Sequence, residues 1–229
     1  MQQVHRDTRP KRPLAPILTL LQKMFPSLSG RLKRKYWEKA WIDEQQSPET
    51  LSTALPSEIQ QAVSDEWLKA GCSVLDIGCG RGQISAWLAE QGYEVVGGEL
   101  ADAAVELARQ HFGDVGKNLS YRQLDICAAE PEPGRFDAAV DRGCFHGIPD
   151  NLKAKYVDNV ALWLRKNGRL LMLTKIDGSQ SETEQRIDRL FSSKFKILRS
   201  EPTLEPLTRS AGPYPRVQAP GLAVWMERK

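Results

Sequence analysis

From about residue 72 to the end of the chain, short apolar segments alternate with amphipathic ones, and this alternation constrains the fold more than any other feature of the sequence. The segments predicted to be strands are residues 73–78, 93–99, 119–126, 136–141, 169–175, 195–201 and 221–228. The segments predicted to be helices are residues 83–92, 101–112, 151–168 and 181–193. Continuous apolar strands separated by helices are typical of a mostly parallel sheet with both faces covered. Such a sheet binds its ligand beyond the carboxyl ends of its strands.

The sequence VLDIGCGRG, residues 74–82, joins the first predicted strand to the first predicted helix of this sheet. Gly78 and Gly80 allow a ligand to approach the backbone closely, and the start of the helix offers N–H groups to an anion. The glycine spacing is GxGxG, whereas the dinucleotide fingerprint is GxGxxG. Asp76, at the end of the strand, would repel a pyrophosphate but would accept an ammonium group. The loop therefore favours an amino-acid moiety over a pyrophosphate.

Two further acids follow the next two predicted strands. Glu99 lies 19 positions after Gly80, where an acid accepts hydrogen bonds from both hydroxyls of a ribose. Asp125 ends the third strand and suits an adenine amino group, and the aliphatic side chain of Ile126 suits the face of the ring. Three acids at three strand ends match a cationic amino-acid nucleoside, so the sequence predicts S-adenosylmethionine as the cofactor.

The series VLDIGCGRG, GGEL, LDI and DRGCF, at these intervals, resembles the class I S-adenosylmethionine-dependent methyltransferases over roughly residues 31–228. The resemblance implies a Rossmann-like, doubly wound α/β fold with a mostly parallel seven-stranded sheet, helices on both faces and an antiparallel last strand. It implies an enzyme that converts S-adenosyl-L-methionine to S-adenosyl-L-homocysteine. The cofactor contacts expected on this basis are Asp76, Gly78, Cys79, Gly80, Glu99, Leu100, Asp125, Ile126 and Asp141.

The stretch DRGCFHGIP, residues 141–149, places a cysteine and a histidine beside a carboxylate. Methyl transfer mainly requires alignment of the nucleophile and needs no covalent intermediate, so we interpret this stretch as a pocket wall. His146 and Asp141 are the candidate catalytic residues, and Arg142 and Cys144 are candidate acceptor contacts. The alternatives are a histidine bonded to the backbone, a cysteine that only fills space, and an arginine that braces the carboxylate.

The same loop resembles that of the thiopurine and tellurite-resistance type methyltransferases, a branch that acts on small thiols and related soft nucleophiles. The segment YWEKAW, residues 36–41, is similar to the N-terminal cover of that branch, which implies that Trp41 closes over the cofactor or substrate. Tyr214, in a Pro-rich loop at residues 202–220, is placed to roof the pocket. The sequence therefore predicts methyl transfer to a small molecule, at a thiol or another soft nucleophile. O- or N-methylation of a small metabolite, and methylation of RNA or protein, stay open as alternatives.

The N-terminal residues differ from the rest in charge. Up to Lys39 the chain has ten Lys or Arg residues and two acids, although the whole chain carries a net charge of only +3. We expect residues 1–30 to be a basic arm, partly disordered, with a short amphipathic helix. Residues 31–229 then form the methyltransferase domain, with a helical cover at residues 31–70. An organellar transit peptide and weak contact of the arm with a membrane surface are the alternatives for this segment.

The four cysteines, Cys72, Cys79, Cys127 and Cys144, have no ligand-like spacing with the three histidines. We expect reduced cysteines, no metal site and a cytoplasmic protein. No apolar run approaches the roughly 18 residues that span a bilayer. We expect a small-molecule substrate and no nucleic-acid partner, and the sequence does not indicate an oligomeric state.

Overall fold

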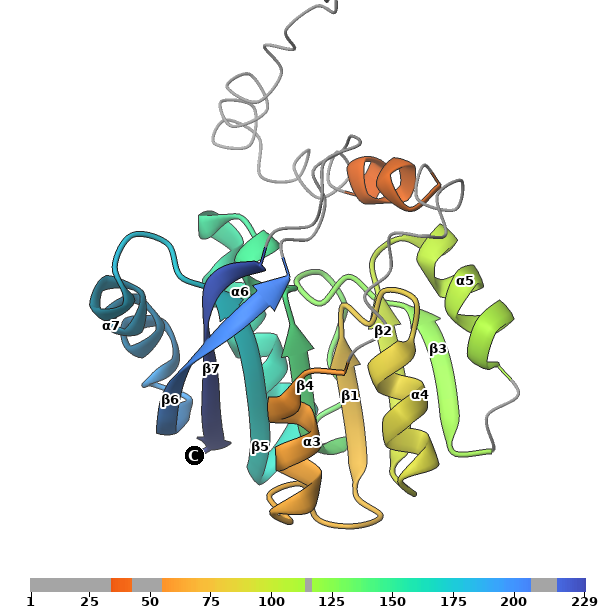
Figure 1. The fold of residues 1–229 in the computed structure, drawn as a ribbon, viewed down its shortest axis with the longest axis horizontal. Helices are drawn as coiled ribbons and strands as arrows, with labels where there is room; N and C mark the ends of the chain where they lie inside the picture. The colour runs from red at the N-terminus through yellow and green to blue at the C-terminus, as the bar shows by residue number, and fades with distance from the viewer. Residues whose placement is uncertain (1–33, 43–54, 114–116, 207–217) are drawn as a thin grey trace, which may run out of the picture.

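The computed structural model of the chain describes residues 34–42, 55–113, 117–206 and 218–229 (Figure 1). In this part of the chain seven strands form one sheet, in the order β3-β2-β1-β4-β5-β7-β6. The strands are β1 Ser73–Ile77, β2 Glu94–Glu99, β3 Leu119–Gln123, β4 Phe136–Arg142, β5 Leu164–Lys175, β6 Phe195–Pro206 and β7 Gln218–Arg228. Strands β1 to β5 are parallel, and β7 lies antiparallel between β5 and β6. The predicted Rossmann-like, doubly wound sheet with an antiparallel last strand is confirmed.

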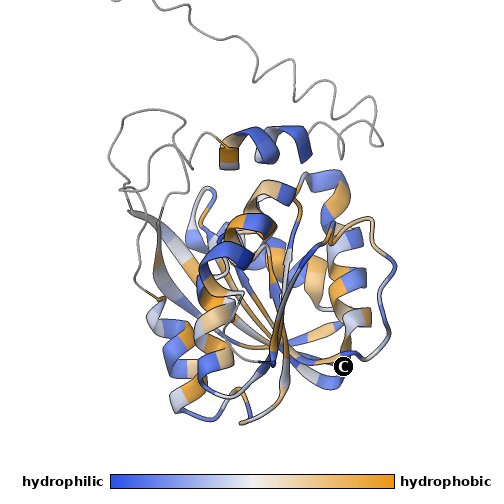
Figure 2. Cartoon of the chain, turned by 90° about the vertical axis from the view of Figure 1, so that its right-hand side faces the viewer, coloured by the Kyte–Doolittle hydropathy of each residue, from blue (hydrophilic) through white to orange (hydrophobic). Residues whose placement is uncertain are grey.

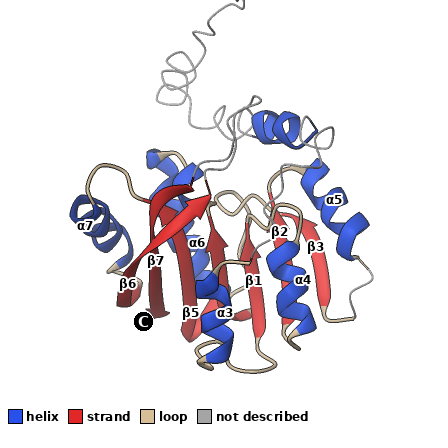
Figure 3. Ribbon diagram, viewed as in Figure 1, coloured by secondary structure: helices blue, strands red, loops and turns tan. Residues whose placement is uncertain are grey.

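Helices cover both faces of this sheet (Figure 3). The first face carries α3 Ser57–Ser64, α4 Gln83–Glu90 and α5 Asp102–Phe112, and the second carries α6 Asp150–Trp163 and α7 Gln180–Phe191. Figure 2 shows hydrophobic residues along the strands and hydrophilic residues on the outward sides of the helices. One core therefore lies on each side of the sheet, as burial of both strand faces requires.

The alternation of side chains along β4 decides how its last residues are oriented. Ala138 and Val140 pack in the core of the first face, and Ala139 packs in the core of the second. Successive strand residues point to opposite faces. Asp141 is therefore directed toward α6, and Arg142 toward the face of α4.

Several boundaries differ from the sequence predictions. The helix predicted to end at residue 168 ends at Trp163, and β5 begins at Leu164. The register between β4 and β5 shifts at this point, and Asn167 adopts a left-handed conformation, with φ of 60°. The extra residues are thus accommodated in a bulge at the amino end of β5. The predicted loop at residues 202–220 is also shorter than expected, because β6 and β7 extend into it.

A helix at residues 34–42 lies within the range predicted to be a helical cover. It lies above the carboxyl ends of the parallel strands, beside α5 (Figure 1). The predicted arm, residues 1–30, and Tyr214 lie outside the described residues. Within the ranges that the structure describes, no helix has the length and apolar character needed to cross a bilayer.

Candidate active site

Asp76, the first predicted site residue, lies near the carboxyl end of β1 and is 2% exposed. The hydroxyl of Ser85, in the first helical turns of α4, donates a hydrogen bond to Asp76 Oδ2 at 2.5 Å. Burial raises the pKa of Asp76 to about 6, whereas the hydrogen bond from Ser85 lowers it. The nearby carboxylate of Glu99 contributes to this rise, and the charge of Arg142 opposes it. Asp76 is therefore a buried acid whose charged form would be stabilised by a cation.

The glycine loop after β1 is held in shape by its own N–H groups. Gly78 N and Cys79 N both donate to the Gly98 carbonyl, at 2.7 and 3.1 Å, and Gly80 N donates to Glu99 Oε2 at 3.1 Å. We expected these N–H groups to face a ligand carboxylate, but the structure turns them toward β2. The loop thus shapes the site mainly through its left-handed turns, with φ of 70° at Gly78 and 54° at Gly80.

Glu99, the last residue of β2, is 8% exposed and joins two parts of the site. Its Oε2 accepts the hydrogen bond from Gly80, and its Oε1 accepts hydrogen bonds from Leu100 N at 2.8 Å and Ala101 N at 3.2 Å. The carboxylate therefore connects the glycine loop to the turn before α5. Both oxygens lie at the carboxyl edge of the sheet, where a ribose was predicted.

Asp125 and Ile126 lie just beyond β3, which ends at Gln123, and not within the strand as predicted. Asp125 is partly buried, and its Oδ1 accepts a hydrogen bond from Cys127 N at 3.0 Å, which closes a turn. Ile126 is 5% exposed and packs in the core of the α6 face. Asp125 lies at the carboxyl edge of the sheet, where the adenine contact was predicted. Most of the Ile126 side chain packs in the core.

Asp141, predicted to be catalytic, is completely buried and binds the loop that follows it. Its Oδ1 accepts a hydrogen bond from Cys144 N at 2.9 Å, and its Oδ2 accepts one from Phe145 N at 3.1 Å and one from the Tyr156 hydroxyl at 2.6 Å. Tyr156 comes from α6, and burial and the Asp141 charge hold the pKa of its phenol well above the usual range. The Asp141 carboxylate thus anchors the DRGCFHG loop to α6.

The loop carries His146, in a single turn of 3-10 helix, Phe145–Gly147. His146 Nδ1 is buried and has no hydrogen-bond partner among the described residues. Burial, together with the charges of Lys175 and Lys153, lowers the pKa of His146 to about 4. The imidazole is therefore neutral at physiological pH, and one of its polar atoms is left for a ligand. The predicted alternative, a histidine bonded to the backbone through this atom, does not agree with the geometry.

The neutrality of His146 can be tested by titration. The ring-proton chemical shifts of His146, assigned by comparison with a His146→Asn variant, are expected to stay constant from pH about 8 down to about 5.5. An ordinary histidine titrates near 6.5 and would change over this range. NMR titration of the ligand-free protein measures this directly, and an inflection of the His146 signal near pH 6.5 would contradict the burial argument.

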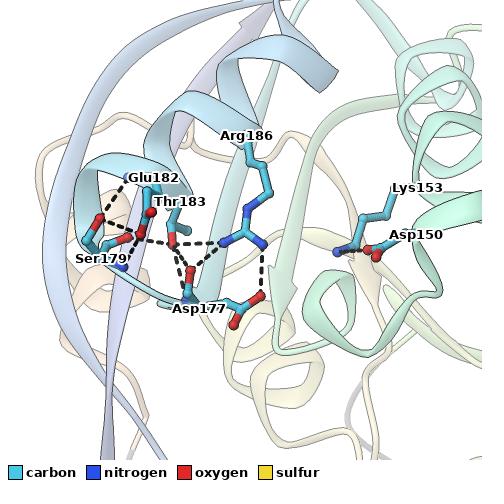
Figure 4. Close-up of polar contacts among 7 residues, drawn as sticks. All are labelled: Asp150, Lys153, Asp177, Ser179, Glu182, Thr183 and Arg186. Atoms are coloured by element: carbon cyan, nitrogen blue, oxygen red, sulfur yellow. Dashed lines mark hydrogen bonds and ion pairs between the residues drawn. The ribbon is translucent and has the colours of Figure 1, made fainter. Parts of the chain in front are cut away.

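Two cations beside this loop have no hydrogen bond or ion pair within the described part of the chain. They are Arg142, at the end of β4, and Lys175, at the end of β5, and both are partly buried. Lys153 differs, because Asp150 holds its ammonium group at 2.8 Å (Figure 4). Asp150 is the first residue of α6 and makes no side-chain cap.

The helix at residues 34–42 covers the glycine loop. A Cβ at Gly80 would lie 3.0 Å from the Trp41 ring, and one at Gly147 would lie 3.7 Å from the Trp37 ring. Between them, the Glu38 carboxylate accepts hydrogen bonds from Asp102 N at 2.9 Å and Ala103 N at 3.0 Å, at the start of α5. The predicted cover residue Trp41 is thus brought to the site, and Glu38 attaches the cover helix to the domain.

Cys144 lies against the glycine loop as well. A Cβ at Gly78 would approach Cys144 Cβ to 2.8 Å, so the two loops touch. Cys79, on the other side, is partly buried, and desolvation holds the pKa of its thiol well above the usual value. Cys79 therefore does not have the depressed pKa of a nucleophile. This packing favours the predicted pocket wall over a covalent role.

A cavity of about 280 Å³ lies at the opposite edge of the sheet and is not part of this site. Its lining includes Trp67, Cys72, Asp137, Arg165 and Arg169. These residues lie at or before the amino ends of β1, β4 and β5. Ligands of parallel α/β sheets bind at the carboxyl ends, where the residues described above converge.

Comparisons with known proteins agree with this geometry. Residues 74–168 match a family described as "Methyltransferase domain". A 2-heptyl-1-hydroxyquinolin-4(1H)-one methyltransferase of Mycobacteroides abscessus is 26% identical over 66% of this chain and 73% of its own length. The matched segment, residues 74–168, is a methyltransferase domain, and the relatives support the S-adenosylmethionine-dependent class I type.

Two further proteins are similar to this chain, one in sequence and one in fold. A ubiquinone biosynthesis O-methyltransferase of Xylella fastidiosa is 37% identical over 46% of this chain, but the match spans only 42% of that relative. A TehB-like S-adenosylmethionine-dependent methyltransferase of Corynebacterium glutamicum has a similar fold, with a TM-score of 0.59, 18% identity, and coverage of 87% of this chain and all of the other. The predicted class and cofactor are confirmed by these comparisons.

The site of this methyltransferase fits S-adenosylmethionine. The cofactor carries an α-ammonium group, and Asp76 is a buried carboxylate whose hydrogen-bond donor, Ser85, is neutral. Glu99 presents a second carboxylate at the neighbouring strand end. Within the described ranges no group of three potential ligands could hold a metal ion. The donor set is thus acidic and suited to an organic cation.

Sequence reasoning missed four residues that the structure brings to the site of this methyltransferase. They are Glu38, Ser85, Tyr156 and Lys175. Tyr156 and Lys175 lie far from the glycine loop in sequence, and no local motif marks them. The alternation along β4 provides a signal for Tyr156, because it directs Asp141 toward the helix that follows the loop.

Proposed function

We propose that this methyltransferase transfers a methyl group from S-adenosylmethionine to a small molecule that presents an acidic O–H or S–H group. The observation that carries the proposal is the pair of buried carboxylates, Asp76 and Glu99, on either side of a glycine loop, with the unpartnered His146 Nδ1 on the loop beyond β4. The two carboxylates suit the cofactor. The histidine nitrogen suits a polar methyl acceptor.

On the cofactor side, Asp76 would accept the α-ammonium group and Glu99 the ribose hydroxyls. Asp125 would accept the adenine amino group, and the side chain of Leu100, next to Glu99, would pack on the ring. Gly78, Cys79 and Gly80 shape the space by close packing, because their N–H groups are already bonded. When bound, the cofactor supplies an electrophilic methyl group, and the chain provides alignment and excludes water.

On the acceptor side, Asp141 acts as a positioning residue, because its carboxylate is buried and bonded to Cys144, Phe145 and Tyr156. It fixes the loop that presents His146. His146 would form a hydrogen bond with the acceptor through a neutral ring nitrogen, and the protonation state of the acceptor decides which of the two donates. Trp41 would exclude water above the glycine loop.

The acceptor atom was predicted to be sulfur, from the resemblance of the DRGCFHG loop to enzymes that methylate thiols. A specific observation favours oxygen as the second candidate. The relative from Xylella fastidiosa is named as an O-methyltransferase, and the one from Mycobacteroides abscessus is named for a 1-hydroxy substrate. Oxygen and sulfur acceptors share an acidic hydrogen, which is the property that the proposal requires.

Labelled methyl transfer tests the function. Wild-type protein is incubated with labelled S-adenosylmethionine and a panel of thiols, phenols, N-hydroxy heterocycles and amines, with RNA and a histone mixture in parallel. We expect turnover on acidic O–H or S–H compounds. Transfer to RNA or histones alone, or no transfer although S-adenosylhomocysteine binds by calorimetry, would refute the proposal.

Glu99→Ala is expected to weaken S-adenosylhomocysteine binding about tenfold or more, because the ribose hydroxyls lose a charged acceptor. Calorimetry measures the affinity. Glu94→Ala, which removes an exposed acid at the other end of β2, serves as the control and should bind like wild type. Equal affinities of all three proteins would show that Glu99 is not part of the cofactor site.

A further inference from the structure

We infer that the acceptor binds as an anion, held by Arg142 and Lys175 at the ends of β4 and β5. This rests on the proposed function and narrows it, because it assigns the charge state of the acceptor and two residues that recognise it. The acceptor class is an ionised thiol, phenol or N-hydroxy compound.

The first argument is the orientation of the two strand ends. Arg142 pairs in register with Leu173, and Lys175 lies two residues further along β5. Paired residues of parallel strands, and residues two apart on one strand, point to the same face. Leu173 packs in the core of the α3 and α4 face, so Arg142 and Lys175 both extend that face at the carboxyl edge. Asp76 belongs to the same face, through its pairing with Val140.

The second argument is that neither cation has a hydrogen bond or an ion pair within the described residues, although the charge of Arg142 acts on Asp76 and lowers its pKa. Partly buried cations are normally paired, because their desolvation is otherwise uncompensated. Within the described residues no carboxylate or carbonyl engages the Arg142 guanidinium or the Lys175 ammonium group. The predicted alternative for Arg142 was a brace for Asp141, but Asp141 is bonded to Tyr156 and to the backbone of Cys144 and Phe145.

The third argument is that the segment after Lys175 is held in place. Asp177 N donates to Thr183 Oγ1 at 3.1 Å, and Arg186 binds the Asp177 carboxylate at 2.8 Å (Figure 4). Ser179 and Glu182 form a capping box at the start of α7. Lys175 is therefore attached to a rigid turn, and its position next to the loop of His146 is defined.

The charges around His146 agree with an anionic acceptor. On the α6 side, Lys153 is paired with Asp150, and Asp141 is engaged by hydrogen bonds. On the α4 side, Asp76 lies below Arg142, and Glu99 stands at the next strand end. The two acids that face the cofactor are matched by a cationic cofactor. Lys175 and Arg142 are the cations left to face the acceptor.

His146 is too weak a base to remove the proton of the acceptor. A thiol with a pKa of about 8.5 cannot transfer its proton easily to a histidine with a pKa of about 4. The difference corresponds to roughly four orders of magnitude in the proton-transfer equilibrium. An acceptor that arrives ionised avoids this step, and cations beside it lower its own pKa.

The chemical step then balances without a base. A lone pair of the acceptor anion forms the new bond to the methyl carbon, and the bond from that carbon to the sulfonium sulfur breaks, with its electron pair returning to sulfur. An anion and a cation give two neutral products. The neutral methylated product loses its attraction to Arg142 and Lys175, which favours its release.

A chromophoric acid tests the inference without turnover. 4-Nitrophenol, whose anion absorbs visible light, is titrated with pH in the presence of protein saturated with S-adenosylhomocysteine. The bound probe is expected to have an acid dissociation constant about tenfold or more above that of the free probe. Lys175→Gln and Arg142→Gln should each remove most of this change, and Lys175→Arg should retain it.

Lys166→Gln is the matched control, because it removes one exposed cation at the opposite edge of the sheet. In this variant, bound 4-nitrophenol should have the same acid dissociation constant as in wild type. No binding of the probe by wild type, or an unchanged dissociation constant in both Gln variants, overturns the inference. Weaker binding of S-adenosylhomocysteine by Arg142→Gln also overturns it, since the guanidinium then serves the cofactor. The labelled-transfer panel decides the proposed function separately, because this titration requires no methyl transfer.

Discussion

Asp76→Asn is expected to weaken S-adenosylhomocysteine binding by about tenfold or more and, at the same time, to stabilise the ligand-free protein. The loss of affinity follows from removal of the charge that would face the α-ammonium group. The gain in stability follows from burial, because a 2% exposed carboxylate with a raised pKa is held in an unfavourable charged form at neutral pH. Asn retains an acceptor for the Ser85 hydroxyl.

The pH dependence has a defined sign. The pKa of Asp76 in the folded state, about 6, is raised above its unfolded value of 3.8. The favourable contribution of the protonated form is therefore complete below pH about 4 and is lost as the pH rises through 6. The free energy of unfolding of Asp76→Asn should exceed that of wild type by about 1–3 kcal/mol at pH 8 and by much less at pH 4.

Urea unfolding at the two pH values, combined with calorimetry, measures both effects. Asp158→Asn is the control, because this acid is exposed on α6 and pairs with Lys194 on the surface. Asp158→Asn should change neither the difference in unfolding free energy between pH 8 and pH 4 nor the affinity for S-adenosylhomocysteine. Wild-type affinity in Asp76→Asn would remove Asp76 from the cofactor site.

Asp141→Ala is expected to lower the free energy of unfolding by about 3 kcal/mol or more. The substitution leaves the Tyr156 hydroxyl and the N–H groups of Cys144 and Phe145 without their acceptor inside the protein. Urea unfolding at pH 8 measures the loss. A change within 1 kcal/mol of wild type would show that the buried network contributes little.

Tyr156→Phe separates positioning from folding, because it removes one hydroxyl and keeps the ring packing against Phe145 and Phe191. The substitution should lower the free energy of unfolding by about 1.5–3 kcal/mol. We expect its affinity for S-adenosylhomocysteine to stay close to that of wild type and its kcat to fall, because the loop of His146 loses one anchor. An equal loss of cofactor affinity and kcat would indicate general destabilisation instead.

The fold could be predicted well because its signal is local. Each strand is a short apolar run, and each helix has an apolar stripe, so the order of elements determines a parallel sheet with two covered faces. The boundary at Trp163 and Leu164 was missed, since the residues up to Gly168 continue a helical pattern. Pairing with β4 decides that boundary, and pairing is a tertiary effect that a local pattern does not contain.

The site could be predicted only as far as its motifs extend. Asp76 and Glu99 follow strand ends in a recognisable spacing, and the structure places them on either side of the glycine loop. The anchoring of the loop by Asp141 was not predicted, because the partner of its carboxylate, Tyr156, comes from a different element. Likewise, the loop N–H groups of Gly78 and Gly80 turn inward, since the acceptors on β2 that engage them are distant in sequence.

Glu38 attaches the cover helix, residues 34–42, to the start of α5, close to the residues that bind Glu99. Asp102 and Ala103, which Glu38 binds, follow directly after Leu100 and Ala101, whose N–H groups bind Glu99. We expect a ligand bound at Glu99 to stabilise the docked helix, and by thermodynamic linkage the docked helix would then strengthen ligand binding by the same free energy. We expect amide hydrogen exchange in residues 34–42 to slow when S-adenosylhomocysteine saturates the protein. The exchange rate of this helix would then report the fraction of protein that has bound ligand.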